Sequence, residues 1–543
     1  MNAVSRAARA IACLGWLVAA AAATAPTASA ASAHPEPERV QATTASGRVE
    51  GERQSSVIAF RGIPYAAPPI GAKRFRPPEP PLAWTGVRPA LDFGPACPQI
   101  IDADLTENNN AVMSEDCLTL NVWTPKVDHR KRPVLFWIHG GAYVVGSSRN
   151  TWYDGAHLAA RGDVVVVSIN YRLGAWGFLS LGSFGPEYAG SANDALLDMV
   201  AALQWVRRNI DAFGGDPARV TIFGESAGAS ATGALLSMPA SEGLFAGAIL
   251  QSGVASARSK DGLQRQNRLA EEFMKLAGAR TPADLIPKSM QDLLQVQQQI
   301  FSSHSELGTF VPSVDGSVIP DQPFAVVSAG RGHRVPILIG TTLEEMRYFS
   351  TVEDLGLERK PRALLMEQLQ ANAGDRAQEI LDTYQRLYPA WGDAVVQIAS
   401  DAIMRLPSIR LAQAASAHQP VYMYLFTYRS NSTYRNFGSA HAMELPFVFG
   451  TEDLPEAMAF TGRDPRRHAL ADAMMDTWIA FARTGNPTRA SGLRWPAYDP
   501  AARSTMELGT TIRLLQDPLA EQRKVWGEEP LRVERTWRLL QEN

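Results

Sequence analysis

The chain has 543 residues, of which 45% are hydrophobic and 20% charged, and its formal net charge is −3. This composition excludes a disordered or fibrous protein and is typical of a globular chain. It contains no block rich in Lys and Arg, so we expect no nucleic-acid partner. The length allows several domains, but a single large α/β domain with insertions fits equally well.

The first 30 residues have the pattern of a secretory signal peptide. Arg6 and Arg9 form a short basic head, and an apolar, Ala-rich stretch follows at 10–23. Small residues at 28–30 offer a cleavage site, and residues 31–33 offer a second one. The apolar stretch is too short to cross a hydrocarbon layer of about 30 Å, which argues against a membrane anchor. We therefore expect a secreted or periplasmic protein, with a signal typical of bacteria.

Residues 31–45 are small, polar and contain prolines, and we expect them to form a flexible leader. We expect one domain over 46–543, opening with a hairpin between 49 and 60. The stretch 60–81 is so rich in Pro and Gly that it cannot be helical and must form an irregular surface segment.

Apolar runs of β-type composition then recur along the chain, separated by loops and helices. They lie at 118–123, 134–138, 164–169, 220–223, 246–250, 335–339 and 421–426. Because both faces of these runs are apolar, we expect strands covered on both sides, as in a mostly parallel sheet. A helix is predicted over 195–213, between the third and fourth of these runs. Strands that alternate with helices in this way are typical of an open, doubly wound α/β fold. Helix-rich polar segments at 260–305 and 355–415 are interpreted as insertions around a pocket.

The motif Gly224-Glu225-Ser226-Ala227-Gly228 follows one of these runs and precedes a helix-prone stretch. This context predicts a strand–turn–helix elbow that exposes the Ser226 hydroxyl at the carboxyl edge of the sheet. Without that context, a Gly-rich turn with a solvated serine would explain the motif equally well. A serine hydroxyl needs a basic partner and an acid that orients the base, so a His and a carboxylate are expected nearby.

A tetrahedral intermediate on Ser226 also needs hydrogen-bond donors for its oxyanion. Gly140 and Gly141 follow a predicted strand, and loops of this kind supply backbone N–H groups in lipases and esterases. The N–H of Ala227, the residue after the serine, is the third expected donor.

Removal of the signal peptide takes Cys13 and leaves Cys97 and Cys117, which lie 20 residues apart. In an exported chain this pair predicts one disulfide, and two free buried thiols are the alternative. The histidines show no metal-ligand spacing near the cysteines, so no metal site is expected.

Together these motifs resemble the type-B carboxylesterases, the cholinesterase-like branch of the α/β-hydrolase fold, and are most similar to its bacterial, para-nitrobenzyl-esterase-like members. The similarity extends from about residue 48 to about 500. Its signatures include FRGIPYAAPPIGAKRF at 60–75, SEDCLTLNVW at 114–123, IHGGAY at 138–143, GESAGA at 224–229, GTTLEE at 340–345 and HAMELPFVFG at 441–450.

The resemblance implies a serine esterase that needs no cofactor or metal and acts on small-molecule esters. It assigns Glu345, the second carboxylate of its motif, as the acid and His441 as the base. The chain order Ser226, Glu345, His441 is that of the α/β-hydrolases. It also implies that Glu225 and Glu444 are acids near the imidazolium, with surface carboxylates as the alternative.

Further positions follow from the resemblance alone. Ser252 matches a family serine near the triad, and Cys97 and Cys117 match the family's first disulfide loop. Two buried ion pairs are implied as well, between Arg74 and Glu115 and between Arg172 and Asp198.

The chain departs from the family pattern at Met199 and Met346, and the second of these is expected to affect the loop of the acid. The loop between Cys97 and Cys117 contains no aromatic residue, which disfavours choline esters, because cholinesterases carry there an aromatic that binds the ammonium. A lipase is disfavoured by the polar 260–305 insertion, and a non-catalytic binding protein is disfavoured by the intact triad.

Overall fold

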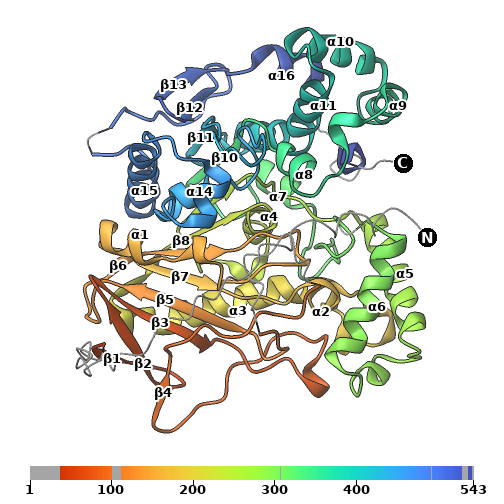
Figure 1. Cartoon of the computed structure of the whole chain (residues 1–543). Helices are drawn as coiled ribbons and strands as arrows, with labels where there is room; N and C mark the ends of the chain where they lie inside the picture. The colour runs from red at the N-terminus through yellow and green to blue at the C-terminus, as the bar shows by residue number, and fades with distance from the viewer. Residues whose placement is uncertain (1–36, 101–111, 306, 491, 529–535, 541–543) are drawn as a thin grey trace, which may run out of the picture. The chain divides into compact units, whose positions relative to one another are not determined.

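The computed structural model describes residues 37–100, 112–305, 307–490, 492–528 and 536–540. The predicted signal peptide at 1–30 and the first part of the leader lie outside these residues. From Glu38 onward, the described residues form one compact unit, built around a 13-stranded sheet (Figure 1).

The strands run in the spatial order β1-β2-β3-β5-β7-β6-β8-β9-β10-β11-β12-β13, and β4 pairs with β2. Pairs from β7–β6 through β11–β12 are parallel, as is the β2–β4 pair, whereas the other pairs at the two ends of the sheet are antiparallel. Their bounds are β1 Arg39–Thr44, β2 Gly47–Gln54, β3 Val57–Pro64, β4 Val87–Pro89, β5 Thr119–Thr124, β6 Arg132–Ile138, β7 Val165–Ile169, β8 Gly215–Glu225, β9 Gly247–Gln251, β10 Ile337–Thr342, β11 Val421–Phe426, β12 Ser504–Leu508 and β13 Ile512–Gln516.

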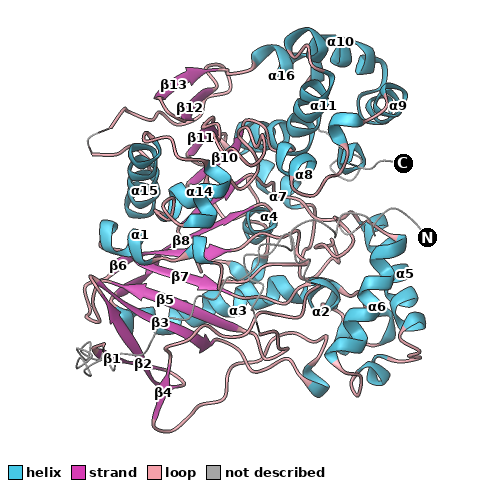
Figure 2. Cartoon of the chain, in the orientation of Figure 1, coloured by secondary structure: helices cyan, strands magenta, loops and turns pink. Residues whose placement is uncertain are grey.

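Helices cover the two faces of this sheet (Figure 2). Their bounds are α1 Ala156–Gly162, α2 Gly174–Phe178, α3 Asp194–Asn209, α4 Ala227–Leu235, α5 Lys260–Leu276, α6 Met290–Ser303, α7 Pro323–Ser328, α8 Arg347–Thr351, α9 Arg362–Ala373, α10 Ala377–Leu387, α11 Trp391–Ser400, α12 Leu406–Ala415, α13 Leu445–Phe449, α14 Pro455–Thr461, α15 Arg467–Thr484 and α16 Ala520–Trp526. No helix in the described ranges is long and apolar enough to span a bilayer.

The central strands are apolar on both faces because each face meets its own core. In β6, Val134, Phe136 and Ile138 belong to one apolar cluster, whereas Leu135 and Trp137 belong to another. The predicted apolar runs all form strands, and the predicted α/β-hydrolase architecture with its mostly parallel sheet is confirmed.

The expected leader through residue 45 is wrong in its last part. Arg39–Thr44 form β1, which pairs in antiparallel register with β2. The strand lies at the edge of the sheet, so only Ala42 and Thr44 are buried. Val40 is half-buried, and the remaining side chains are polar. A polar edge strand has the same composition as a loop, which explains the error.

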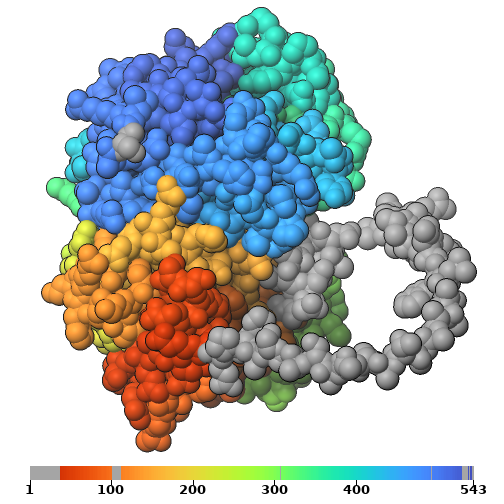
Figure 3. All heavy atoms as spheres, turned by 60° about the vertical axis from the view of Figure 1, so that its left-hand side comes forward, coloured from red at the N-terminus to blue at the C-terminus, as the bar shows by residue number. Residues whose placement is uncertain are grey.

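The two insertions are helical as predicted. Residues 260–305 contain α5 and α6, which pack against each other, and residues 355–415 contain α9 to α12. Between α11 and α12 the chain passes through a single π-helical segment at Asp401–Arg405. Segments far apart in the sequence also meet. For example, α1 packs on α15, in the region where orange and blue atoms adjoin in Figure 3.

Candidate active site

Ser226 lies on a sharp turn between β8, which ends at Glu225, and α4, which begins at Ala227. Its backbone has φ 57° and ψ −120°, a conformation that L-residues rarely adopt. The flanking glycines make the turn possible: a Cβ on Gly224 would lie 2.5 Å from the backbone of Gly228, and a Cβ on Gly228 would overlap the Ile138 carbonyl. The predicted strand–turn–helix elbow is present.

Glu345 and His441 come from two loops at the same end of the sheet. Glu345 follows β10, and His441 lies between β11 and α13. Nδ1 of His441 lies 2.6 Å from Oε2 of Glu345, and both side chains are buried. The other carboxylate oxygen, Oε1, accepts a hydrogen bond from the N–H of Thr342 at 2.7 Å. Glu345 therefore fixes the orientation of the imidazole, as an acid in a triad must.

The other imidazole nitrogen, Nε2 of His441, lies 3.0 Å from Oε1 of Glu225, the residue directly before Ser226. Among the described residues, no hydrogen bond joins Ser226 Oγ to the imidazole. The base is thus oriented by Glu345 on one side and faces the elbow on the other.

Three buried carboxyl groups, those of Glu225, Glu345 and Glu444, surround this one imidazole. Burial opposes protonation of His441, but the nearby carboxylates outweigh it and raise the pKa of the imidazole. Burial, together with mutual repulsion, also raises the pKa of Glu225 and of Glu444. The predicted surface alternative for these two acids is wrong, because they are only 3% and 0% exposed.

The loop after β6 approaches the serine closely. A Cβ on Gly140 would lie 2.8 Å from Oε2 of Glu225 and 3.2 Å from Cβ of Ser226. Gly141 has φ 103°, a backbone conformation that residues with a side chain rarely adopt. Gly140 is thus needed for the close approach to the serine, and Gly141 for the path of the loop. In the described part of the chain, the N–H groups of Gly140, Gly141 and Ala227 donate to no other residue. These three groups are available to a ligand.

Ser252 lies behind the elbow, fully buried, with φ 52°. Its neighbour Gln251 was not predicted from the sequence, yet it links the site to the core. Gln251 donates to Oε1 of Glu444 at 3.2 Å and accepts from Nε1 of Trp478 at 3.0 Å. Its place directly before Ser252 was the signal available in the sequence.

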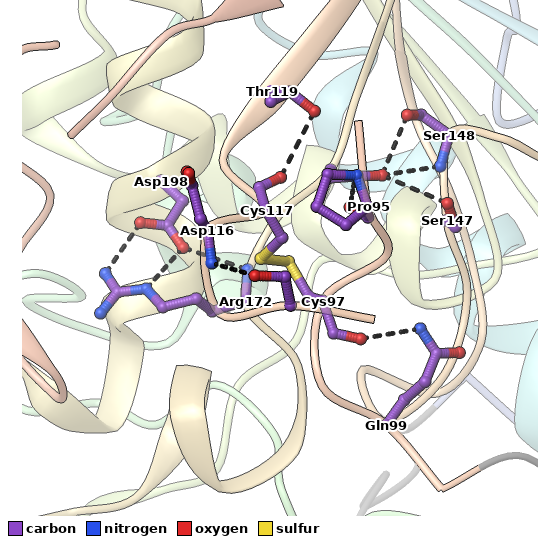
Figure 4. The surroundings of a disulfide bond; sticks show 12 residues. Pro95, Cys97, Gln99, Asp116, Cys117, Thr119, Ser147, Ser148, Arg172 and Asp198 are labelled. Atoms are coloured by element: carbon purple, nitrogen blue, oxygen red, sulfur yellow. Dashed lines mark hydrogen bonds and ion pairs between the residues drawn. A yellow bond between two sulfur atoms is a disulfide. The ribbon is translucent and has the colours of Figure 1, made fainter. Parts of the chain in front are cut away.

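The disulfide between Cys97 and Cys117 is present (Figure 4). Next to it, Gln99 donates to the carbonyl oxygens of Cys97 and of Gly146, at 3.1 and 2.9 Å. Gly146 lies in the same loop after β6 as Gly140 and Gly141, and its N–H donates to Oε1 of Gln99 at 3.0 Å. The disulfide is therefore coupled to the loop that lies beside the serine.

Both predicted ion pairs form and are buried. Arg74 binds both carboxylate oxygens of Glu115, at 2.6 and 2.8 Å. Arg172 binds both oxygens of Asp198, each at 2.8 Å, and a third partner that the sequence did not indicate, Asp194, lies 3.3 Å from its Nη1. Two aspartates thus share one arginine, and burial above all raises the pKa of Asp194 to about 7.

One group among the described residues has the geometry to hold a metal ion. Ligand atoms of Glu452, Asp453 and His468 lie within 4.8 Å of one another. Arg467 already binds Asp453 at 2.5 Å, so the group is a charge-paired cluster at the start of α15. It contains none of the predicted site residues.

Comparison with known proteins agrees with this fold. The profile of the carboxylesterase family matches residues 37–526. Para-nitrobenzyl esterase of Bacillus subtilis (strain 168) is 38% identical over 488 residues, which cover 89% of this chain and 97% of that protein. Fumonisin B1 esterase of Sphingopyxis macrogoltabida is 38% identical over 474 residues, 84% of either chain. The solved structure of a thermophilic PNB esterase aligns with a TM-score of 0.81 at 37% identity, over 90% of this chain and 99% of that one. The chain therefore belongs to the carboxylesterase family and is a carboxylic-ester hydrolase of the α/β-hydrolase fold.

Proposed function

We propose that this chain is a secreted serine carboxylesterase that cleaves small carboxylic esters through a covalent acyl-enzyme. One observation carries the proposal: His441 lies 2.6 Å from Glu345 beside an elbow that holds Ser226 at φ 57°. A nucleophile, a base and an orienting acid are the parts that acyl transfer requires.

In the first half-reaction, Oγ of Ser226 attacks the ester carbonyl carbon and passes its proton to Nε2 of His441. The electron pair of the carbonyl bond moves to oxygen, where the N–H groups of Gly140, Gly141 and Ala227 bind it. The intermediate then collapses, the bond to the alcohol oxygen breaks, and the alcohol leaves with the proton from His441.

In the second half-reaction, water gives a proton to His441 and its oxygen attacks the acyl carbon. Collapse of this intermediate releases the carboxylic acid and returns the proton to Ser226. Glu345 remains ionised throughout and stabilises the imidazolium that forms in each half-reaction. Glu225 and Glu444 add to this stabilisation when they are ionised, because they face the same ring.

Export is part of the proposal and is supported by the N-terminal pattern and by the buried Cys97–Cys117 disulfide, since disulfides persist in oxidising compartments. The substrates are small esters, and the absence of aromatic residues from the sequence between the two cysteines disfavours choline esters.

The test compares the wild-type protein with Ser226→Ala on para-nitrophenyl esters from acetate to palmitate. We expect rapid turnover of the short esters, and a loss in kcat of about 10⁶-fold in the variant, as triad knock-outs show. Assays of the periplasmic and extracellular fractions with the same esters test export.

Equal activity of Ser226→Ala and the wild type would contradict the serine mechanism. A clear preference for palmitate would favour a lipase instead. A folded wild-type protein that cleaves none of the esters would contradict the broad esterase activity proposed here.

A further inference from the structure

The carboxylate of Glu344, the residue before Glu345, is buried between two arginines. Glu344 is 4% exposed. Its Oε1 accepts from Nη2 of Arg347 at 3.0 Å, and its Oε2 lies 2.6 Å from Nη2 of Arg429. A buried carboxylate with two cationic partners is held firmly, because leaving its charge unpaired would be strongly unfavourable.

The same carboxylate joins two loops. Glu344 donates its N–H to the carbonyl of Ser439 at 2.9 Å, and its Oε2 accepts from the N–H of Ser439 at 2.9 Å. Two residues further along, the N–H of His441 donates to the carbonyl of Glu345 at 3.3 Å. Gly438, at φ 57°, makes room for the carboxylate, because a Cβ there would overlap Oε2 of Glu344. Both loops that carry the acid and the base are therefore joined at Glu344.

Arg347 extends this connection to the 355–415 insertion. Besides Glu344, its guanidinium binds Glu358 at 2.7 Å and Asp393 at 2.6 Å, and the arginine is 4% exposed. Glu358 lies in the short 3₁₀ turn Leu357–Arg359, and Asp393 lies in α11. The acid loop is thus anchored on a helical layer as well as on the loop of the base.

From these contacts we propose that Glu344 is a positioning residue whose carboxylate holds residues 343–347 against residues 438–441 and so sets the separation between Glu345 Oε2 and His441 Nδ1. The proposal rests on the proposed triad. It gives Glu344 no contact with substrate. Misplacement of a catalytic group by about 1 Å lowers the rate on the order of 100-fold, so such an anchor has a measurable kinetic effect.

A second explanation for any kinetic effect of Glu344 is its charge acting on His441 through space. The two explanations predict opposite results when the exposed partner Arg429 is removed. Arg429→Gln leaves the charge of Glu344 less compensated, which through space favours the imidazolium and raises the pKa of His441. A loosened loop instead weakens the contact between Glu345 and the imidazolium, which lowers that pKa.

Three carboxyl groups face His441: those of Glu225 on β8, Glu345 after β10 and Glu444 before α13. Tyr348 and Phe349 of α8 lie beside its ring. Both variants leave all of them unchanged. A change in the pH profile therefore reports the separation of Glu345 and His441 or the charge at Glu344, and nothing else that faces the ring.

The experiment measures kcat, KM, their pH profiles and thermal stability for Glu344→Gln, Arg429→Gln, Glu115→Gln and Ser226→Ala on para-nitrophenyl acetate. Glu115→Gln is the matched control, because it breaks a buried carboxylate–arginine pair, with Arg74, outside the candidate triad. We expect Glu344→Gln to lower kcat by 10- to 100-fold with KM within twofold of wild type. We expect the acid limb of kcat/KM to move to lower pH in both Glu344→Gln and Arg429→Gln, and to stay unchanged in Glu115→Gln.

Three results would overturn the proposal. One is a wild-type kcat and pH profile in folded Glu344→Gln. Another is a loss of activity no greater than that of Glu115→Gln at the same loss of thermal stability. The third is an acid limb that moves to higher pH in Arg429→Gln, which would assign the effect to charge through space. Turnover by Ser226→Ala would instead contradict the proposed triad itself, so the two failures can be told apart.

Discussion

Gly140 brings the loop after β6, which carries two of the proposed oxyanion donors, into contact with the serine elbow, and its missing side chain allows the approach. A methyl group there would lie 2.8 Å from Glu225 and 3.2 Å from Cβ of Ser226, closer than side-chain carbons normally pack. We expect Gly140→Ala to fold, because one loop can shift by a few tenths of an ångström, but to displace an oxyanion donor. The expected loss in kcat is on the order of 10²- to 10³-fold, the effect of removing such a donor.

Steady-state kinetics on para-nitrophenyl acetate test this prediction, with Gly182→Ala as the control. Gly182 has ordinary φ and no atom within 3.5 Å of the added Cβ, so its alanine variant should keep wild-type kcat. A Gly140→Ala enzyme with wild-type kcat would contradict the role given to this loop.

Single residues could be predicted from the sequence where a local motif carries them. Ser226 follows from the glycines around it and from the strand before it. Glu345 and His441 could be assigned only by resemblance to a family, because one carboxylate after a strand resembles many others. Glu344, Gln251 and Asp194 were missed, since their importance comes from burial against residues far away in the chain.

At the scale of elements, α3 contributes both aspartates that bind Arg172. In the unfolded chain Asp194 ionises near pH 4, whereas burial raises its pKa to about 7 in the fold. Between these values the folded protein keeps a proton that the unfolded chain has lost. Asp194 therefore makes the protein less stable as pH rises from about 4 to 7, and the whole penalty is present above pH 7.

Asp194→Asn removes this titration while leaving the pair between Arg172 and Asp198. We expect the melting temperature of the variant minus that of the wild type to rise from pH 5 to about pH 7 and to level off towards pH 8. Differential scanning calorimetry over this range measures it, with Asp375→Asn, a change at an exposed residue, as the control. A difference that does not change with pH would contradict the raised pKa of the buried Asp194.

Elements with an apolar pattern on both faces were predictable, and the central strands from β5 to β11 all were. β1 was not, because an edge strand is largely exposed to water. Its sequence is therefore mostly polar and resembles that of a loop. β12 and β13 were not singled out either. β12 is mostly buried, but Ser504, Thr505 and Glu507 make its sequence polar, and β13 has no fully buried residue. A sequence that is apolar on both faces, which creates the signal, is missing at the ends of this sheet.

At the scale of the whole molecule, the Cys97–Cys117 disulfide closes a loop of about 20 residues and lies beside Gln99, which bonds to Gly146 in the loop after β6. Loop-closure entropy predicts a stabilisation of about 3 kcal/mol. We expect the double variant Cys97→Ser, Cys117→Ser to melt at a lower temperature and to lose activity on heating earlier than the wild type.

Thermal melts with and without dithiothreitol test this prediction. Reductant should lower the melting temperature of the wild type towards that of the double variant and leave the variant unchanged. If both proteins melt at the same temperature under both conditions, the disulfide does not stabilise the fold.

The edge strands β1 and β13 affect whether a second copy of this chain could add a strand to the sheet. At one edge β1 is six residues long, and Arg39 pairs with Glu52 across to β2. At the other edge Arg513 of β13 pairs with Glu507 of β12. Short edge strands that carry charge are poor templates for strand addition by a second molecule. We therefore expect the folded sheet, wide as it is, to resist strand addition by a second copy at both edges.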